Sequence, residues 1–229
     1  MNKILLIVVV IIVVFAFALF RRRPKRANPR AGAGSVPNWP PNLDPERIKT
    51  MSQRPHSLSF VAFTEKVLLG IPRLLGDCKY VVITSTQVQD TPAKLYVSCE
   101  GPRGPNNAIA YKAAFEAAGH TFLLEPEMIL AATNQDQLIR FAKQFNCRII
   151  AASWERVSES AMLLVFTGDG LQSQTWYCEG KPEGEQINPH PTLANSPDHQ
   201  GLIAAIRQLG VPMDVLANAV RPTMYQLQE

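Results

Sequence analysis

The sequence lacks the short motifs by which many enzymes and metalloproteins are recognised. It has no Cys-x-x-Cys pair, no His-Glu-x-x-His, no Gly-x-Ser-x-Gly elbow, no P-loop and no dinucleotide glycine pattern. The four histidines occur singly, and the four cysteines are widely separated, at Cys78, Cys99, Cys147 and Cys178. We therefore expect no metal site and no cofactor, and free thiols rather than disulfides.

Acidic residues are absent before Asp44, and this absence explains the net charge of +4. Seven of the 23 basic residues lie within the first 30 positions. From residue 31 onward, 16 basic residues stand against 19 acidic ones, a balance of 16 − 19 = −3. The basicity therefore belongs to one terminal segment, and we expect no nucleic-acid binding by the rest of the chain.

The segment Ile4–Phe20 contains no charged residue, no proline and no glycine. As a helix it would span about 26 Å, the short end of the range for a bilayer, and it is apolar on every face. A dense cationic flank follows, formed by Arg21, Arg22, Arg23, Lys25 and Arg26. We predict a retained transmembrane anchor through residues 4–20, rather than a cleaved signal peptide or a core helix.

The cationic flank also predicts the topology. Basic residues next to a membrane span stay on the cytoplasmic side, so we expect the N-terminus outside and the C-terminal domain in the cytoplasm, as in a single-pass protein of the bacterial inner membrane. The same cations, at 21–26, are expected to contact anionic lipid headgroups.

Composition divides the chain into three parts. Residues 1–23 form the anchor and the start of its basic flank, residues 24–55 form a linker with seven prolines, and residues 56–229 form the globular part. We predict one α/β domain with a mixed sheet, α+β being the alternative, because helices and strands alternate in the middle of the chain and hairpins flank them. The predicted helices are near 57–70, 107–119, 133–146, 198–209 and 212–220, and the predicted strands are 79–86, 94–100, 121–125, 147–153, 161–168 and 174–179.

The loop "EGPRGPNN", which begins at Glu100, is one candidate for chemistry. Arg103 could bind an anion beyond the end of a strand, as ligands do in α/β sheets. The element order predicted over 59–125 resembles the core of restriction-endonuclease-like domains. That resemblance implies a divalent ion held by two acids, for which Asp90 and Glu100 are candidates, and a lysine, for which Lys112 is the candidate. Pro102 stands where the lysine of that family's motif would be.

Two functions follow as hypotheses. The first is a membrane-anchored binding or assembly module without a recognisable catalytic set, with an unidentified protein partner. Its candidate contact features are Trp39, the Trp176/Tyr177 hairpin and the loop 180–197. The alternative is an anchored hydrolase or ligand-binding domain that uses Glu100, Arg103 and Lys112. Whether the chain is an enzyme is left open, with a preference for a non-enzyme.

Overall fold

The computed structural model describes residues 57–76, 79–84, 91–100, 111–126, 131, 134–156 and 158–228. The predicted anchor at 4–20, its cationic flank at 21–26 and the linker at 24–55 lie outside these residues, and so do Asp90 and Arg103. No helix in the described part of the chain is long and apolar enough to cross a membrane. The anchor, the topology and the domain boundaries therefore remain predictions from the sequence.

In the described part of the chain, nine strands form one sheet in the order β2-β9-β3-β4-β1-β5-β6-β7-β8. Every pair of neighbouring strands among the described residues is antiparallel. The strands are β1 (Leu58–Phe63), β2 (Tyr80–Thr84), β3 (Tyr111–Ala117), β4 (His120–Leu124), β5 (Ile149–Glu155), β6 (Ser160–Thr167), β7 (Gly170–Cys178), β8 (Lys181–Pro182) and β9 (Thr223–Leu227). The α/β character is confirmed, but the mixed sheet is wrong. Strands β3 and β4 are joined by a tight hairpin, and the connection from β4 to β5 places these two strands on either side of β1, so no two neighbouring strands among the described residues are parallel.

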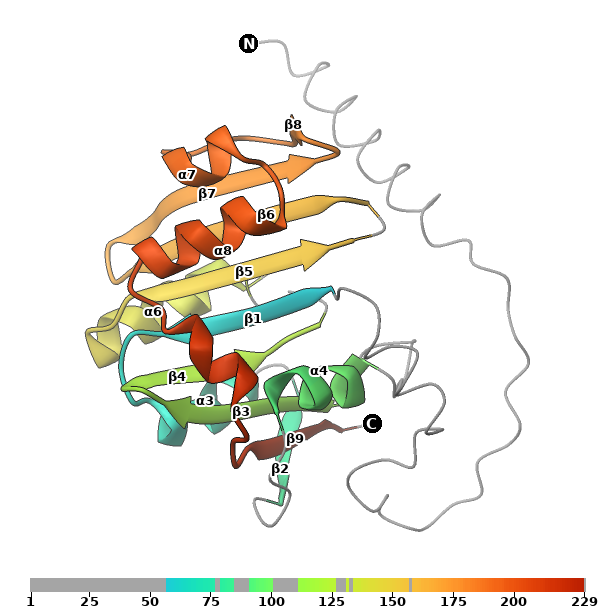
Figure 1. The fold of residues 1–229 in the computed structure, drawn as a ribbon. Helices are drawn as coiled ribbons and strands as arrows, with labels where there is room; N and C mark the ends of the chain where they lie inside the picture. Colours follow the sequence, from blue (N-terminus) through green and yellow to red (C-terminus); the bar gives the residue numbers. More distant parts are fainter. Residues whose placement is uncertain are drawn as a thin grey trace, which may run out of the picture. The chain divides into compact units, whose positions relative to one another are not determined.

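Helices cover both faces of the sheet (Figure 1). The front face in that view carries α4 (Pro92–Glu100), α7 (Pro191–Asn195), α8 (His199–Gln208) and the 3-10 helix η3 (Met213–Ala217). The opposite face carries the 3-10 helix η1 (Leu68–Gly70), α3 (Ile71–Gly76) and α6 (Gln135–Phe145). Each face therefore has its own hydrophobic cluster, and the sheet separates the two.

Strand β1 lies inside the sheet and is apolar on both sides. Phe60 and Ala62 belong to the front cluster, whereas Val61 and Phe63 belong to the opposite one, and all four are fully buried. The sequence "SFVAF" consequently shows no strand-like alternation, which is typical of a strand covered on both faces. The predicted helix over 57–70 is wrong for this reason, although the short helices η1 and α3 follow.

Two neighbouring elements were also assigned the wrong type. The predicted strand 94–100 is helix α4, whose first residue is Pro92, a favoured residue in the first turn of a helix. The predicted helix over 107–119 is strand β3, in which Ala113 and Ala114 are fully buried on opposite faces. Its end is the turn to β4, where both Ala118 and Gly119 have positive φ, as a two-residue type I′ hairpin requires.

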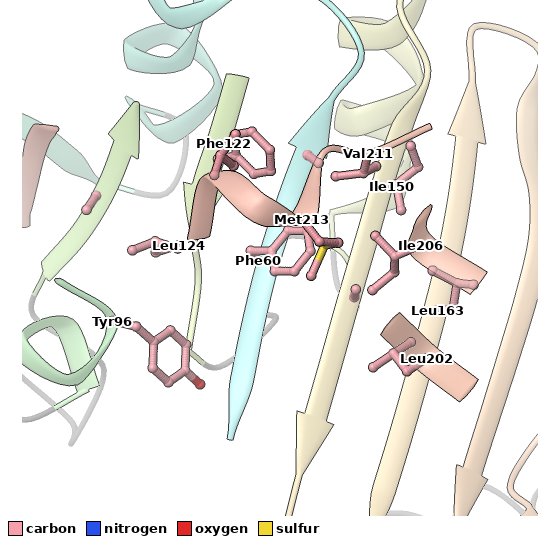
Figure 2. Packing of buried hydrophobic residues seen from close by; sticks show 14 of the residues in the cluster. Phe60, Tyr96, Phe122, Leu124, Ile150, Leu163, Leu202, Ile206, Val211 and Met213 are labelled. Carbon is pink, nitrogen blue, oxygen red and sulfur yellow. The ribbon is translucent and has the colours of Figure 1, made fainter. Parts of the chain in front are cut away.

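The front cluster packs α8 and η3 onto the middle of the sheet, and α4 onto its β3–β4 side (Figure 2). Leu202 and Ile206 of α8 lie over Ile150 and Leu163 of β5 and β6, and Met213 lies over Phe60. Full burial of each such side chain contributes about 1.5–3 kcal/mol. This packing holds the start of α8 beside the ends of β5 and β7.

The remaining predictions agree better with the structure. Strands 79–86, 121–125, 147–153, 161–168 and 174–179 correspond to β2, β4, β5, β6 and β7, and the helices predicted over 133–146 and 198–209 are α6 and α8. The last predicted helix is the 3-10 helix η3. Strand β9, which enters the sheet between β2 and β3, was not predicted from the sequence.

Candidate functional site

Several strands begin or end together at one end of the sheet. Strand β1 and strand β6 begin there, and β4, β5 and β7 end there, because each is antiparallel to its neighbour. A cavity of about 580 Å³ opens at this end. We call it the cleft. Its lining residues are Trp154, Arg156, Glu159, Glu179, Gly180, Pro197, Asp198, His199 and Gln200.

One wall of the cleft is the start of α8. The Asp198 side chain caps this helix by accepting a hydrogen bond from the Gly201 backbone N–H at 2.8 Å. A Cβ atom at position 201 would collide with the backbone carbonyl of Ser196. The close approach that only glycine permits therefore fixes the turn that carries Asp198, His199 and Gln200.

The same region contributes an aromatic surface. The Trp154 and His199 rings lie 5.6 Å apart between centroids and are tilted by 45°. Burial lowers the pKa of His199 below its ordinary value, and the neighbouring Asp198 charge opposes this only in part. At neutral pH the imidazole is therefore uncharged, and the wall that it forms with the indole carries no positive charge.

Carboxylates dominate the charge of the cleft. Glu159, Glu179 and Asp198 stand against Arg156, a balance of 1 − 3 = −2. Among the described residues, none of these four forms an ion pair with another. The pKa of the nearby Cys178 thiol is raised by burial and, in addition, by the charges of Glu179, Glu183 and Glu155. The local field is thus negative.

Two of the carboxylates occupy unusual backbone positions. Glu159 lies in the turn between β5 and β6 with φ 45°, and Glu179 lies in the turn between β7 and β8 with φ 51°. Glycine and asparagine are the usual residues at positive φ, where a side chain with a Cβ is strained. Glutamate at both positions therefore has no conformational advantage.

A second cavity of about 290 Å³ adjoins the cleft and shares Trp154 with it. Hydroxyl groups line much of it, and the Oγ atoms of Ser59 and Ser153 are 2.6 Å apart across β1 and β5. Trp176 also lines this cavity, and 36% of its surface is exposed. Its indole N–H donates to Ser160 Oγ at 3.1 Å. The two residues of the predicted contact hairpin therefore differ in exposure: Trp176 is partly exposed, whereas Tyr177 is buried in the front cluster.

Lys112 takes part in a buried ion pair rather than in an open site. Its Nζ lies 2.8 Å from Glu125 Oε1, and the two side chains are 3% and 1% exposed. The Lys112 ammonium also lies 5.0 Å from the centroid of the Tyr80 ring, a cation–π contact. Tyr225 lies opposite Lys112 on the neighbouring strand β9, and burial raises the pKa of the Tyr225 hydroxyl to about 12.

The structure does not test the predicted grouping of Lys112 with the other candidate residues. Glu100 is the last residue of α4, on the front side of the sheet, and Asp90 and Arg103 lie outside the described residues. The order of elements from β1 to β4 is strand, helix, strand, helix, strand, strand, which differs from the order on which the endonuclease resemblance depended. That resemblance is therefore not supported by the fold.

Cys99, Cys147 and Cys178 are free thiols, and Cys78 lies outside the described residues. Burial raises the pKa of Cys99 to about 12, although the Lys112 charge lowers it in part. Burial and the Glu65 charge raise the pKa of Cys147 to about 11, against a backbone hydrogen bond that lowers it. Neither thiol is ionised at neutral pH, so neither is suited to act as a nucleophile. Within the described ranges, no three His, Cys, Asp or Glu side chains group as a metal site.

The sequence analysis did not identify the cleft. The sequence predicted a helix from residue 198 and a strand that ends at Glu179, but nothing in it indicated that these segments meet Trp154. Comparisons of the chain with protein-family models, with curated proteins and with solved structures gave no match.

Proposed function

We propose that this chain is a single-pass membrane protein whose domain binds a protein partner through the cleft, on the cytoplasmic side of the membrane. The observation that carries the proposal is the composition of the cleft: an aromatic wall of Trp154 and His199 beside carboxylates without ion-pair partners among the described residues. A concave site with apolar walls and a few polar groups is the usual form of a binding site.

The lining of the cleft favours binding over catalysis. Its described residues include one imidazole and three carboxylates that could act as bases, but no serine, threonine, cysteine, lysine or tyrosine that they could activate as a nucleophile. The hydrolase alternative needs Glu100, Arg103 and Lys112 in one pocket, and Lys112 is already bound to Glu125. Nothing among the described contacts favours that alternative.

The predicted anchor and linker, together called the tether, favour a membrane-bound partner for the cleft. A domain held at the membrane by residues 4–20 and the linker 24–55 has a high effective concentration toward membrane-bound partners. Weak contacts in an open cleft are then sufficient for assembly. The cleft lies at the sheet end where β1 begins, and the linker precedes β1 in the sequence.

The proposal is tested by crosslinking the full chain in its native membrane. A photo-reactive amino acid replaces Gln200, which lines the cleft, or Asp169, in the turn at the opposite end of β6 and β7. We expect a crosslinked protein adduct from position 200 and none from position 169. Equal yields of adduct from the two positions would contradict the proposal. Purification in detergent that recovers only this chain, as a monomer, would contradict it as well.

A further inference from the structure

We infer that the cleft receives an arginine side chain from a basic segment of the partner protein. This inference rests on the proposed function and gives the chemistry of the partner. It is carried by the shape, the charge and the aromatic wall of the cleft, taken together.

The charge of the cleft selects a cation. Three carboxylates and one guanidinium line it, and no ion pair among the described residues neutralises them. The charges of Glu155 and Glu183 lie close enough to act on the thiol of Cys178, which precedes Glu179. An anionic ligand such as a phosphate or a lipid headgroup would be repelled by this field.

The aromatic wall selects a guanidinium among cations. A planar guanidinium stacks on an indole face, whereas an ammonium is strongly hydrated and makes only a point contact. The His199 ring extends the surface of Trp154, and burial keeps that ring uncharged at neutral pH, so it does not repel a cation. The titratable groups that line the cleft around His199 are Asp198, Glu159, Glu179 and Arg156.

Glu159 and Glu179 supply the hydrogen-bond acceptors. They project from two different turns, and both line the cleft that Trp154 also lines. A guanidinium offers five N–H donors in a fixed fork, and it can bond to more than one carboxylate while its plane rests on a ring. A volume of about 580 Å³ also leaves room for residues on either side of the arginine.

The predicted topology supplies a source for the arginine. Cytoplasmic segments next to membrane spans are rich in arginine and lysine, and the tether predicted for this chain would hold the cleft on that side of the membrane. A basic juxtamembrane segment of another membrane protein therefore matches both the charge of the cleft and its expected position.

The test measures peptide binding to the full chain purified in a neutral detergent. The probes are three fluorescein-labelled hexapeptides that differ at one central residue, which is arginine, lysine or citrulline. We expect the arginine peptide to bind about fivefold more tightly than the lysine peptide, and the uncharged citrulline peptide not to bind measurably.

Variants of the chain locate the binding. Glu159→Gln and Glu179→Gln should each weaken binding of the arginine peptide by about two- to fivefold, the range for partly exposed ion pairs. Asp169→Asn removes the same charge at the other end of β6 and should leave the affinity unchanged, which controls for net charge. Equal affinity for arginine and citrulline peptides, or equal loss in all three variants, would overturn the inference.

The outcome also separates this inference from the proposed function. Adducts from position 200 without any arginine-dependent peptide binding would refute the arginine inference and leave the binding module in place. The absence of both adducts and peptide binding would refute both.

Discussion

Two regions of this domain hold charged side chains in opposite environments. Lys112 on β3 and Glu125, just after β4, are buried, and the Lys112 Nζ lies 2.8 Å from Glu125 Oε1. At the ends of β5 and β7, Glu159, Glu179 and Arg156 line an open cleft without ion pairs among the described residues. The first pair is part of the folded core, whereas the second group is available to a ligand.

In the first region charge is confined to the folded core, and in the second, on the proposed function, charge serves binding. A buried ion pair returns little net stability, because desolvation offsets the attraction, but breaking it leaves an isolated charge in the core. An exposed carboxylate contributes little to folding, and its removal is tolerated. Substitutions in the two regions should therefore affect different measurements.

The largest expected effect comes from the buried pair. Lys112→Met should lower the free energy of unfolding by about 3–5 kcal/mol, because the Glu125 carboxylate stays buried without its ammonium partner. The measurement is denaturant unfolding of the full chain in detergent, followed by tryptophan fluorescence. Adding Glu125→Leu should restore most of this loss, since the double variant buries no isolated charge.

Lys66→Met is the matched control, because Lys66 is exposed. This substitution should change the free energy of unfolding by no more than about 0.5 kcal/mol, as most surface substitutions do. A Lys112 variant as stable as the Lys66 variant would show that the two regions do not differ as described. The Lys112 variant should nevertheless bind the arginine peptide, provided that it is folded.

The two regions also differ in how far the sequence predicted them. The β5–β6–β7 meander and helix α8 were predicted close to their observed bounds, because their strands are separated by clear turns and Asp198 is a strong cap signal. The β1, α4 and β3 segments were assigned wrongly. Their apolar residues face both sides of a covered sheet, so the periodicity that distinguishes helix from strand is absent.

The candidate site was harder to predict than the fold. Lys112 was predicted as a candidate catalytic residue, yet its partner Glu125 follows a hairpin whose first strand was predicted as a helix. The cleft joins residues near positions 155, 179 and 199, and only the strand order brings these segments together. A single sequence shows the residues of such a site but not their convergence.

Smaller changes in stability are expected from substitutions of the cleft glutamates. Glu159→Gly and Glu179→Gly each place glycine at a positive φ, so each should raise the free energy of unfolding, by up to about 1 kcal/mol. The same variants should weaken binding of the arginine peptide, because they remove a carboxylate of the cleft. Thermal unfolding and peptide binding, measured on the same preparations, give both values.

Asn188→Gly is the control, since Asn188 also has positive φ, at 41°, but does not line the cleft. It should leave peptide affinity unchanged. If either glutamate variant lost stability as well as affinity, the carboxylate would be part of the folded structure, as Glu125 is, and the distinction between the two regions would fail at that position.

The smallest expected effect is a pH dependence that arises beside the cleft. Burial lowers the pKa of both His190, which precedes α7, and His199, at the start of α8. The unfolded chain then binds protons that the folded chain does not, so stability is fully present above about pH 6.5 and is lost as the pH falls through that value toward the folded pKa values. Unfolding free energies measured between about pH 7.5 and 5.5 should decline, and the decline should be shallower in the double variant His190→Gln, His199→Gln. An unchanged decline in that variant would assign the pH dependence to other groups, and the start of α8 would then not be the part of the domain that responds to protons.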